Sequence, residues 1–430
     1  MTASPEPTVA GVTPDPRAGA VAGPVDASAA LVGALFVVAL SLRPQISAIG
    51  PLVPGLIAEF GPSHAFLGLL TAIPVLCMGI FALVGPSVAG WFGNRSGIAL
   101  SVAVLVASGV LRAVAPGAEL VLLATFGIGV GTAVIGPILA MFVRDRMPGH
   151  MVGGTSSYAA GTIVGAAIGA ALAVPLASAF GGWRGSLLAI SLLSTGCVVT
   201  WLVVVRPRRP VAGATAGQGS VAVPRRRRLE LPRLPVRRPV VWAIGLLFAL
   251  QSWLFYGQTA WLASVYIERG WTPQTAAILS AAVNLASLVA IVGVPWGARR
   301  GVSRRAMLTA AAGSSTIGLA GVAIAPAPGF LWAALLGAGL GMTFTLLLTL
   351  PTDISDDPRE VGGAAALMFL VGYLLASIAP SALGAVRDAT GDFGAAIWLL
   401  VGVGLAMLPL SWSLSPRRLR PPRVRVEVPA

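Results

Sequence analysis

This chain has 430 residues, of which 56% are hydrophobic and only 10% are charged. A soluble globular chain carries about 25% charged residues, so the composition argues against a soluble enzyme. It also excludes a disordered chain, because disorder needs low hydrophobicity. The formal net charge is +14, and all 29 basic residues are arginine. With only 2 cysteines, both inside apolar stretches, a disulfide scaffold is excluded, and we expect no metal site and no cofactor.

Long apolar stretches separated by short polar breaks begin after a Pro- and Ala-rich segment, residues 1–28, which we interpret as a disordered cytoplasmic tail. A helix that crosses a bilayer needs about 20 apolar residues, and in lipid each backbone group must be bonded inside its own segment. The sequence therefore predicts an all-α polytopic membrane protein with twelve transmembrane helices. The expected spans are 29–57, 65–89, 97–115, 120–142, 152–176, 185–205, 240–265, 274–296, 306–325, 330–350, 361–384 and 394–414.

The arginines predict the orientation, because cytoplasmic loops of membrane proteins accumulate positive residues. With the N-terminus inside, 24 of the 29 arginines fall in cytoplasmic segments. The outer loops and helix ends receive four, which are Arg112, Arg184, Arg269 and Arg387. We expect an inner (plasma) membrane protein with both termini cytoplasmic and a basic cytoplasmic linker at 206–239. The other expected parts are six-helix bundles at 29–205 and 240–414 and a basic cytoplasmic tail at 415–430.

An internal repeat supports two related halves, since transporter folds are commonly duplicated. Three short matches occur at an offset of about 210 residues, in the same order in both halves. They pair 58–61 with 267–270, 127–131 with 337–341, and 152–154 with 361–363. We interpret the Gly-x-Gly-x-Gly runs at 127–131 and 337–341 as surfaces for close helix packing, with substrate contact as the alternative. The sequence thus predicts two pseudo-symmetric six-helix bundles.

Arg43 is the one charged residue expected deep in the membrane, at the midpoint of the span 29–57. An ionisable residue at that depth is costly and marks a functional site by default. Its guanidinium offers a planar fork that suits a carboxylate or a similar oxyanion. Pro44 follows directly and frees a carbonyl inside the helix, so the alternative is that Arg43 holds this break by bonding freed carbonyls.

Neutral polar residues at similar depth are further candidates for substrate binding. The repeat offset places Ser252 level with Arg43, next to Gln251, and Tyr256 lies one turn further along. Asn284 and Tyr373 lie near the middle of two other spans. Such side chains also bond one another between helices, so this alternative stays open. The candidate substrate-binding set is Arg43, Gln251, Tyr256, Asn284 and Tyr373.

Several short motifs resemble one known transporter family. Leu42-Arg43-Pro44, followed by 50–54 (Gly-Pro-Leu-Val-Pro), resembles the first helix of the cyanate/2-nitroimidazole transporter (CynX/NimT) family of the major facilitator superfamily. Further similarities lie at 181–184, at 252–262 and at 372–380. The resemblance implies two six-helix bundles around a central cavity, alternating access, and a small anionic or small polar nitrogen-containing substrate.

Two positions depart from the family pattern. The loop after Gly85 is where the superfamily carries an acid and an arginine, and we align Gly90 and Trp91 with those places. This alignment puts a gating salt bridge at the loop in doubt. Ala263 stands where the family tends to have proline after Trp-Leu.

The sequence therefore predicts a secondary transporter and no enzyme, with an efflux transporter of drugs or other lipophilic compounds as the alternative. We expect a small-molecule substrate and the lipid bilayer as partners, no nucleic acid, and a monomer in preference to an oligomer. Facilitated diffusion or exchange fits better than proton coupling, because the sequence places no carboxylate or histidine at the depth of Arg43.

Overall fold

The structure, a computed structural model, describes residues 24–207, 235, 236, 238–355 and 357–414. Most of the expected N-terminal tail and basic linker, and all of the C-terminal tail, lie outside the described residues. The helices of the first half are α1 (Pro24–Leu40), α2 (Pro44–Ser47), α3 (Ile49–Phe60), α4 (His64–Phe81), α5 (Gly85–Val114), α6 (Ala118–Arg146), α7 (Met151–Ala179) and α8 (Trp183–Val204). Those of the second half are α9 (Pro239–Glu268), α10 (Pro273–Ala286), α11 (Val289–Arg299), α12 (Arg304–Ile324), α13 (Gly329–Thr349), α14 (Pro358–Ala376), α15 (Ala379–Thr390) and α16 (Gly394–Ser413).

The helices account for twelve membrane crossings. Among the described residues, 11 helical segments are long and apolar enough to span a bilayer, and one of them, His64–Val114, has 51 residues. At 1.5 Å per residue, an unbroken helix of that length would be more than twice as long as the roughly 30 Å hydrocarbon core. The chain turns at Gly93, whose φ of 75° and ψ of 158° are not helical. This segment therefore contains the two expected spans 65–89 and 97–115.

Three spans are interrupted near their middle. The first is divided into α1, α2 and α3, the eighth into α10 and α11, and the eleventh into α14 and α15. The sequence predicted the first interruption from Pro44 and did not predict the other two.

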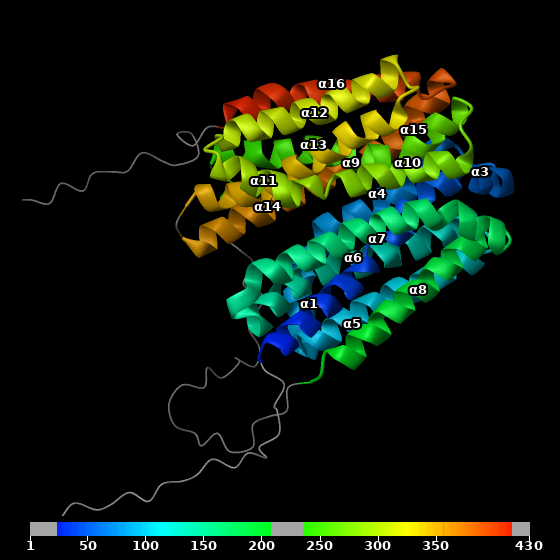
Figure 1. Cartoon of the computed structure of the whole chain (residues 1–430). Helices are drawn as coiled ribbons and strands as arrows, with labels where there is room; N and C mark the ends of the chain where they lie inside the picture. Colours follow the sequence, from blue (N-terminus) through cyan, green and yellow to red (C-terminus); the bar gives the residue numbers. More distant parts are fainter. Residues whose placement is uncertain (1–23, 208–234, 237, 356, 415–430) are drawn as a thin grey trace, which may run out of the picture.

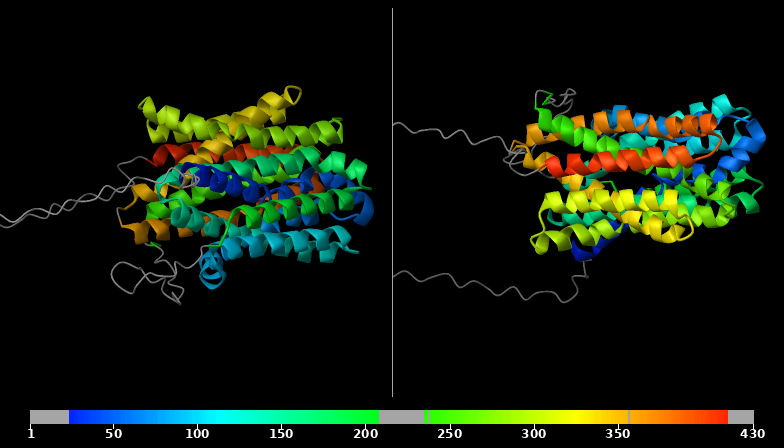
Figure 2. Two further views of the ribbon diagram at one scale, coloured as in Figure 1. Left: turned by 60° about the horizontal axis from the view of Figure 1, so that its bottom comes forward. Right: turned by 90° about the horizontal axis from the view of Figure 1, so that it is seen from above.

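The helices form two bundles, α1–α8 and α9–α16, which lie one above the other in Figure 1 and run roughly parallel in both views of Figure 2. Contacts between the bundles involve α7 with α10, α4 with α14 and α15, and α3 with α9. This arrangement confirms the predicted pair of six-helix bundles. We call the end of the molecule near Gly93, Val205 and Pro239 the linker face, and the end near His64 and Asp388 the opposite face.

The glycine runs confirm the packing interpretation. In α6, a Cβ at Gly129 would lie 2.8 Å from the Sγ of Cys77 in α4, and one at Gly131 would lie 2.7 Å from a carbonyl of α5. In α13, Gly339 faces α12 and Gly341 faces Ser287, directly after α10, at similarly short distances. Alternate residues of a helix lie on different sides of it. Each run therefore allows close approach of a neighbouring segment on two sides.

Candidate functional site

The central element of the site is the break that carries Arg43. The first helix ends at Leu40, residues 41–43 are outside any helix, and Pro44 begins α2. Proline has no N–H to donate to the Leu40 carbonyl and is tolerated in the first turn of a helix, which explains why the break falls here. The amides of Ile46 and Ser47 both donate to the Arg43 carbonyl at 3.0 Å. The backbone of the break is therefore bonded locally, and the Arg43 side chain is available for other contacts.

A glycine row on α7 packs against this break. Gly161, Gly165 and Gly169 recur at every fourth residue and so lie on one face of the helix. A Cβ at Gly165 would clash with the Leu40 carbonyl, and one at Gly169 would clash with Pro44. The close approach of α7 thus fixes the position of the broken segment.

The Arg43 side chain crosses from the first bundle to the second. Its Nη1 donates to the Tyr256 hydroxyl at 3.1 Å. Its guanidinium carbon lies 5.5 Å from the ring centre of Phe255 and 5.6 Å from that of Tyr256, within the range of cation–π attraction. Arg43 also keeps partial exposure although it lies at the middle of a span. The bond observed for this guanidinium thus runs to the other bundle and not to the carbonyls freed by the break.

Aromatic side chains of the second bundle continue from Tyr256. Tyr373 of α14 lies 6.4 Å from Tyr256 between ring centres. Phe369 stacks on Tyr373 at 5.8 Å with an interplanar angle of 11°, and Phe248 meets both edge-on. Arg43 therefore faces an aromatic wall, which we define as Phe248, Phe255, Tyr256, Phe369 and Tyr373. Such a wall offers flat π faces beside one cation.

The structure brings together three of the five predicted site residues, Arg43, Tyr256 and Tyr373. The other two bond to helix carbonyls. Gln251 donates to the Leu340 carbonyl of α13 at 3.5 Å, and Asn284 donates to the Ser280 carbonyl in its own helix at 2.9 Å. Both residues are buried. In this conformation they therefore serve helix packing, which is the alternative that the sequence left open.

A second contact between the bundles closes the opposite face. The carboxylate of Asp388 in α15 accepts from the backbone N–H groups of His64 and Ala65, at 3.1 and 3.0 Å, and lies 2.7 Å from His64 Nδ1. The first turn of α4 is thus capped by a carboxylate from the other bundle. Nearby, Gly68 and Gly384 permit close contact between α4 and α15, because a Cβ at either would overlap the facing backbone. The bundles are therefore joined at this face.

Within the first bundle, Glu59 accepts from Arg184 and Trp183 at the opposite face. These hydrogen bonds, chiefly that from Arg184, hold the pKa of the Glu59 carboxyl, which lies beyond the predicted first span, below its usual range.

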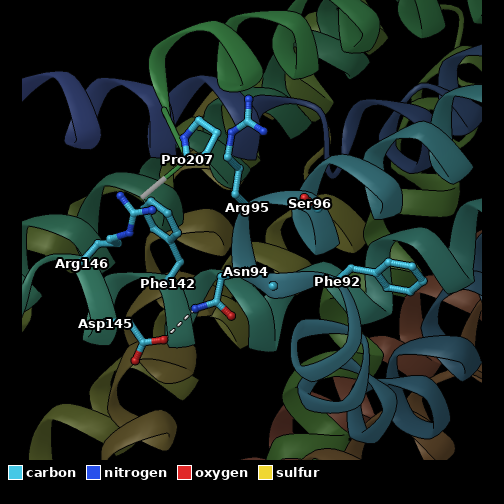
Figure 3. Close-up of a pocket in the computed structure, with 9 residues that line it drawn as sticks. Phe92, Asn94, Arg95, Ser96, Phe142, Asp145, Arg146 and Pro207 are labelled. Carbon is cyan, nitrogen blue, oxygen red and sulfur yellow. Dashed lines mark hydrogen bonds between the residues drawn. The ribbon is translucent and has the colours of Figure 1, made fainter. Parts of the chain in front are cut away.

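A pocket of about 330 Å³ lies at the linker face, beside the turn at Gly93. Figure 3 shows Asn94 donating to Asp145, while Phe92 points away from the other lining residues. Arg95 donates to the carbonyls of Leu202 and Val205 at the end of α8. The sequence places Gly90 and Trp91 where the superfamily carries an acid and an arginine. The structure instead finds the polar contacts at Asn94 and Arg95, which follow the turn.

Arg112 lies at a helix end, in the last turn of α5, as the sequence predicts, but its side chain is wholly buried, with 0% exposure, which the sequence does not predict. Its Nη2 donates to the backbone carbonyl of Gln45 at 2.7 Å and also to the Gln45 side chain. The aromatic wall was also missed, because phenylalanines in an apolar helix look like ordinary packing residues. The four-residue spacing of Phe369 and Tyr373, which places both on one helix face, could have indicated it.

Comparisons with known proteins agree with this geometry. The family model described as Major Facilitator Superfamily matches residues 34–380. The chain is 28% identical over 382 residues to the cyanate transport protein CynX of Escherichia coli (strain K12), covering 88% of this chain and 96% of that protein. It is 25% identical over 380 residues to the 2-nitroimidazole transporter of the same organism, covering 88% and 92%.

Among solved structures, a D-xylose-proton symporter is similar with a TM-score of 0.71 at 17% identity, covering 91% of this chain and 98% of that one. At this identity the likeness shows the fold alone.

Proposed function

Because this chain belongs to the Major Facilitator Superfamily, and is therefore a multi-pass membrane transporter and not an enzyme, we propose that it carries a small anionic or small polar nitrogen-containing solute by alternating access. One observation carries the proposal. Arg43 is a partly exposed cation at mid-membrane, on the boundary between the bundles, and its hydrogen-bond partner is a neutral hydroxyl. Among the described residues, none of the buried polar side chains is an Asp or a Glu.

The charge balance favours an anion, or a solute that presents an electronegative edge to Arg43. A charged side chain at mid-membrane is costly without a carboxylate partner, and a bound anion would offset that cost with charge-assisted hydrogen bonds. The names of two relatives, a cyanate transport protein and a 2-nitroimidazole transporter, support small nitrogen-containing solutes. We propose the same substrate class for this chain and leave the individual solute open.

The proposal assigns different roles to the candidate residues. Arg43 binds the electronegative end of the solute, and Tyr256 orients Arg43 and can donate its own hydroxyl to the solute. Tyr373 supplies an aromatic face. Gln251 and Asn284 contribute polar contacts if the solute replaces their present carbonyl partners.

Export of lipophilic cations is the alternative. Such a substrate would gain from a buried carboxylate, and the described acids lie at exposed or half-exposed positions. The aromatic wall could accept a lipophilic ring, so the alternative is decided by competition experiments.

We also propose that the linker face is cytoplasmic and that both termini lie on that side of the plasma membrane. The arginine distribution supports this orientation. We propose further that the bundles 29–205 and 240–414, joined by the basic linker 206–239, work together in a monomer.

The test is uptake into proteoliposomes of radiolabelled cyanate and of 2-nitroimidazole, by the parent protein and by Arg43→Ala. A hydrogen bond to a charged group is worth about 1.5–3 kcal/mol, so we expect Arg43→Ala to lower uptake at subsaturating solute by roughly ten- to a hundredfold. Arg144→Ala is the matched control, because its side chain is 67% exposed at the end of α6. Uptake by Arg43→Ala equal to that of the parent would refute the proposal. Inhibition by lipophilic cations and not by anions would favour the export alternative.

A further inference from the structure

Arg112 is the one arginine of the described residues whose side chain is wholly buried. It lies in the last turn of α5, and its side chain points into the first bundle toward α2 and α8. The proposed transport function does not use it directly. A fully buried charge is costly in free energy unless it is paired, so the burial of the Arg112 side chain needs a physical explanation.

The contacts of Arg112 disperse its charge without neutralising it. Nη2 donates to the backbone and side-chain oxygens of Gln45. Nε and Nη1 have no acceptor within the described part of the chain. An amide and a carbonyl are dipoles, so the net positive charge stays inside the bundle. The ion pairs of the described residues do not include Arg112 either.

The surroundings of Gln45 are built to hold this contact. Gln45 Nε2 donates to Ser191 Oγ at 2.8 Å and to the Leu187 carbonyl of α8 at 3.3 Å. A Cβ at Gly109, one turn before Arg112, would lie 2.5 Å from Ser191 Oγ and 2.8 Å from Gln45 Nε2. A glycine at 109 is therefore what allows Gln45, Ser191 and Arg112 to meet.

The same short helix connects Arg112 to the proposed binding site. Gln45 is the second residue of α2, and Arg43 is the residue directly before that helix. Arg43 extends across the bundle boundary to Tyr256, whereas Gln45 faces back into its own bundle. Arg112 thus holds the turn that presents Arg43 and adds a second positive charge behind it.

We propose that Arg112 is a positioning and specificity-determining residue for the anion site, because its uncompensated charge, held on Gln45, keeps the site around Arg43 positive and selects anionic solutes. The proposal rests on the proposed transport function. At an effective dielectric of about 20, two unit charges on the order of 10 Å apart interact by roughly 1.5 kcal/mol, and we take the corresponding roughly tenfold change in anion affinity as the expected effect.

The test replaces the neutral amide by a carboxylate of nearly equal shape. Gln45→Glu places a negative charge where Arg112 already donates. We expect the KM for cyanate in proteoliposomes to rise roughly tenfold, with the maximal rate within about twofold of the parent. We also expect Gln45→Glu to melt at a higher temperature than Gln45→Met, because both variants lose the Nε2 donor of Gln45 and only the glutamate gives the buried cation a partner.

Gln45→Met is the matched control. It removes every hydrogen bond of the Gln45 side chain and leaves Arg112 charged, so it measures the loss of the contact alone, and we expect a smaller rise in KM than in Gln45→Glu. A parent-like KM in Gln45→Glu would overturn the proposal. An equal rise in KM in both variants would also overturn it, because the contact between Arg112 and Gln45 would then act only by holding the structure and not through its charge. If the parent transports neither cyanate nor 2-nitroimidazole, the proposed function fails. The melting temperature still decides the inference in that case, because a Gln45→Glu protein no more stable than Gln45→Met contradicts an uncompensated Arg112.

Discussion

Removal of the Asp388 carboxylate should open the opposite face of the molecule. Asp388 caps the first turn of α4 from the other bundle through two backbone N–H groups, and it also contacts His64 Nδ1. Loss of a helix N-cap costs about 0.5–2 kcal/mol, and loss of a negative charge at a helix N-terminus costs about 0.3–1 kcal/mol. These contacts exist only while α4 and α15 are together. We therefore expect Asp388→Ala to shift the equilibrium toward an open face by about 1–2 kcal/mol, or roughly five- to thirtyfold.

The assay is a distance measurement between spin labels across that face, at Pro62→Cys and Ala389→Cys, with Cys77 and Cys197 replaced by alanine. An open state populated at about 2% in the parent would rise to roughly 10–40% in Asp388→Ala. Asp392→Ala is the control, because Asp392 bonds the Gly394 amide in its own loop and not the other bundle. Distance distributions in Asp388→Ala that match those of the parent would show that this contact does not hold the face closed.

Two further substitutions test how Arg43 is held. A side chain at Gly165 would overlap the Leu40 carbonyl, so Gly165→Val should lower thermal stability by about 1–3 kcal/mol or more, measured in detergent. Gly196→Val, at a position with open space around its Cα, should leave stability unchanged, and equal losses in both would contradict close packing of α7 against the end of α1. Tyr256→Phe removes a hydroxyl that can donate to the solute. The loss of a hydrogen bond worth about 1 kcal/mol predicts a roughly fivefold higher KM for cyanate uptake, whereas an unchanged KM would remove Tyr256 from the site.

The twelve spans and the depth of Arg43 were predictable because they depend on local chemistry. A spanning helix satisfies its own backbone, so apolar length alone indicates where it lies, and Pro44 marks its own break. The break at Ser287 has no proline beside it, so the sequence contained no comparable indication of it. Pro380, at the second position of α15, could have indicated the break at Ser377.

The burial of Arg112 was not predictable, because it depends on contacts distant in the sequence. Its position near the end of an apolar stretch is compatible with an arginine that reaches the membrane surface. Its side chain instead turns inward, because Gly109 leaves space and Gln45, 67 residues away, offers acceptors. A count of arginines in loops assigns each residue by its place along the span and cannot detect such a contact.

The two halves are related by an internal repeat, but they contribute different chemistry to the site. Arg43 lies at a break in the first half, whereas Ser252, its counterpart by the repeat, lies inside the unbroken helix α9 and donates to its neighbour Gln251. The first bundle supplies the two cations, Arg43 and Arg112, and the second supplies the aromatic wall. A solute held between them would have its charge bound by one bundle and its face by the other. Separation of the bundles at either face would then weaken the contacts of the solute with Arg43 and with the aromatic wall at the same time. An asymmetric site of this kind therefore couples solute binding to the relative position of the two bundles.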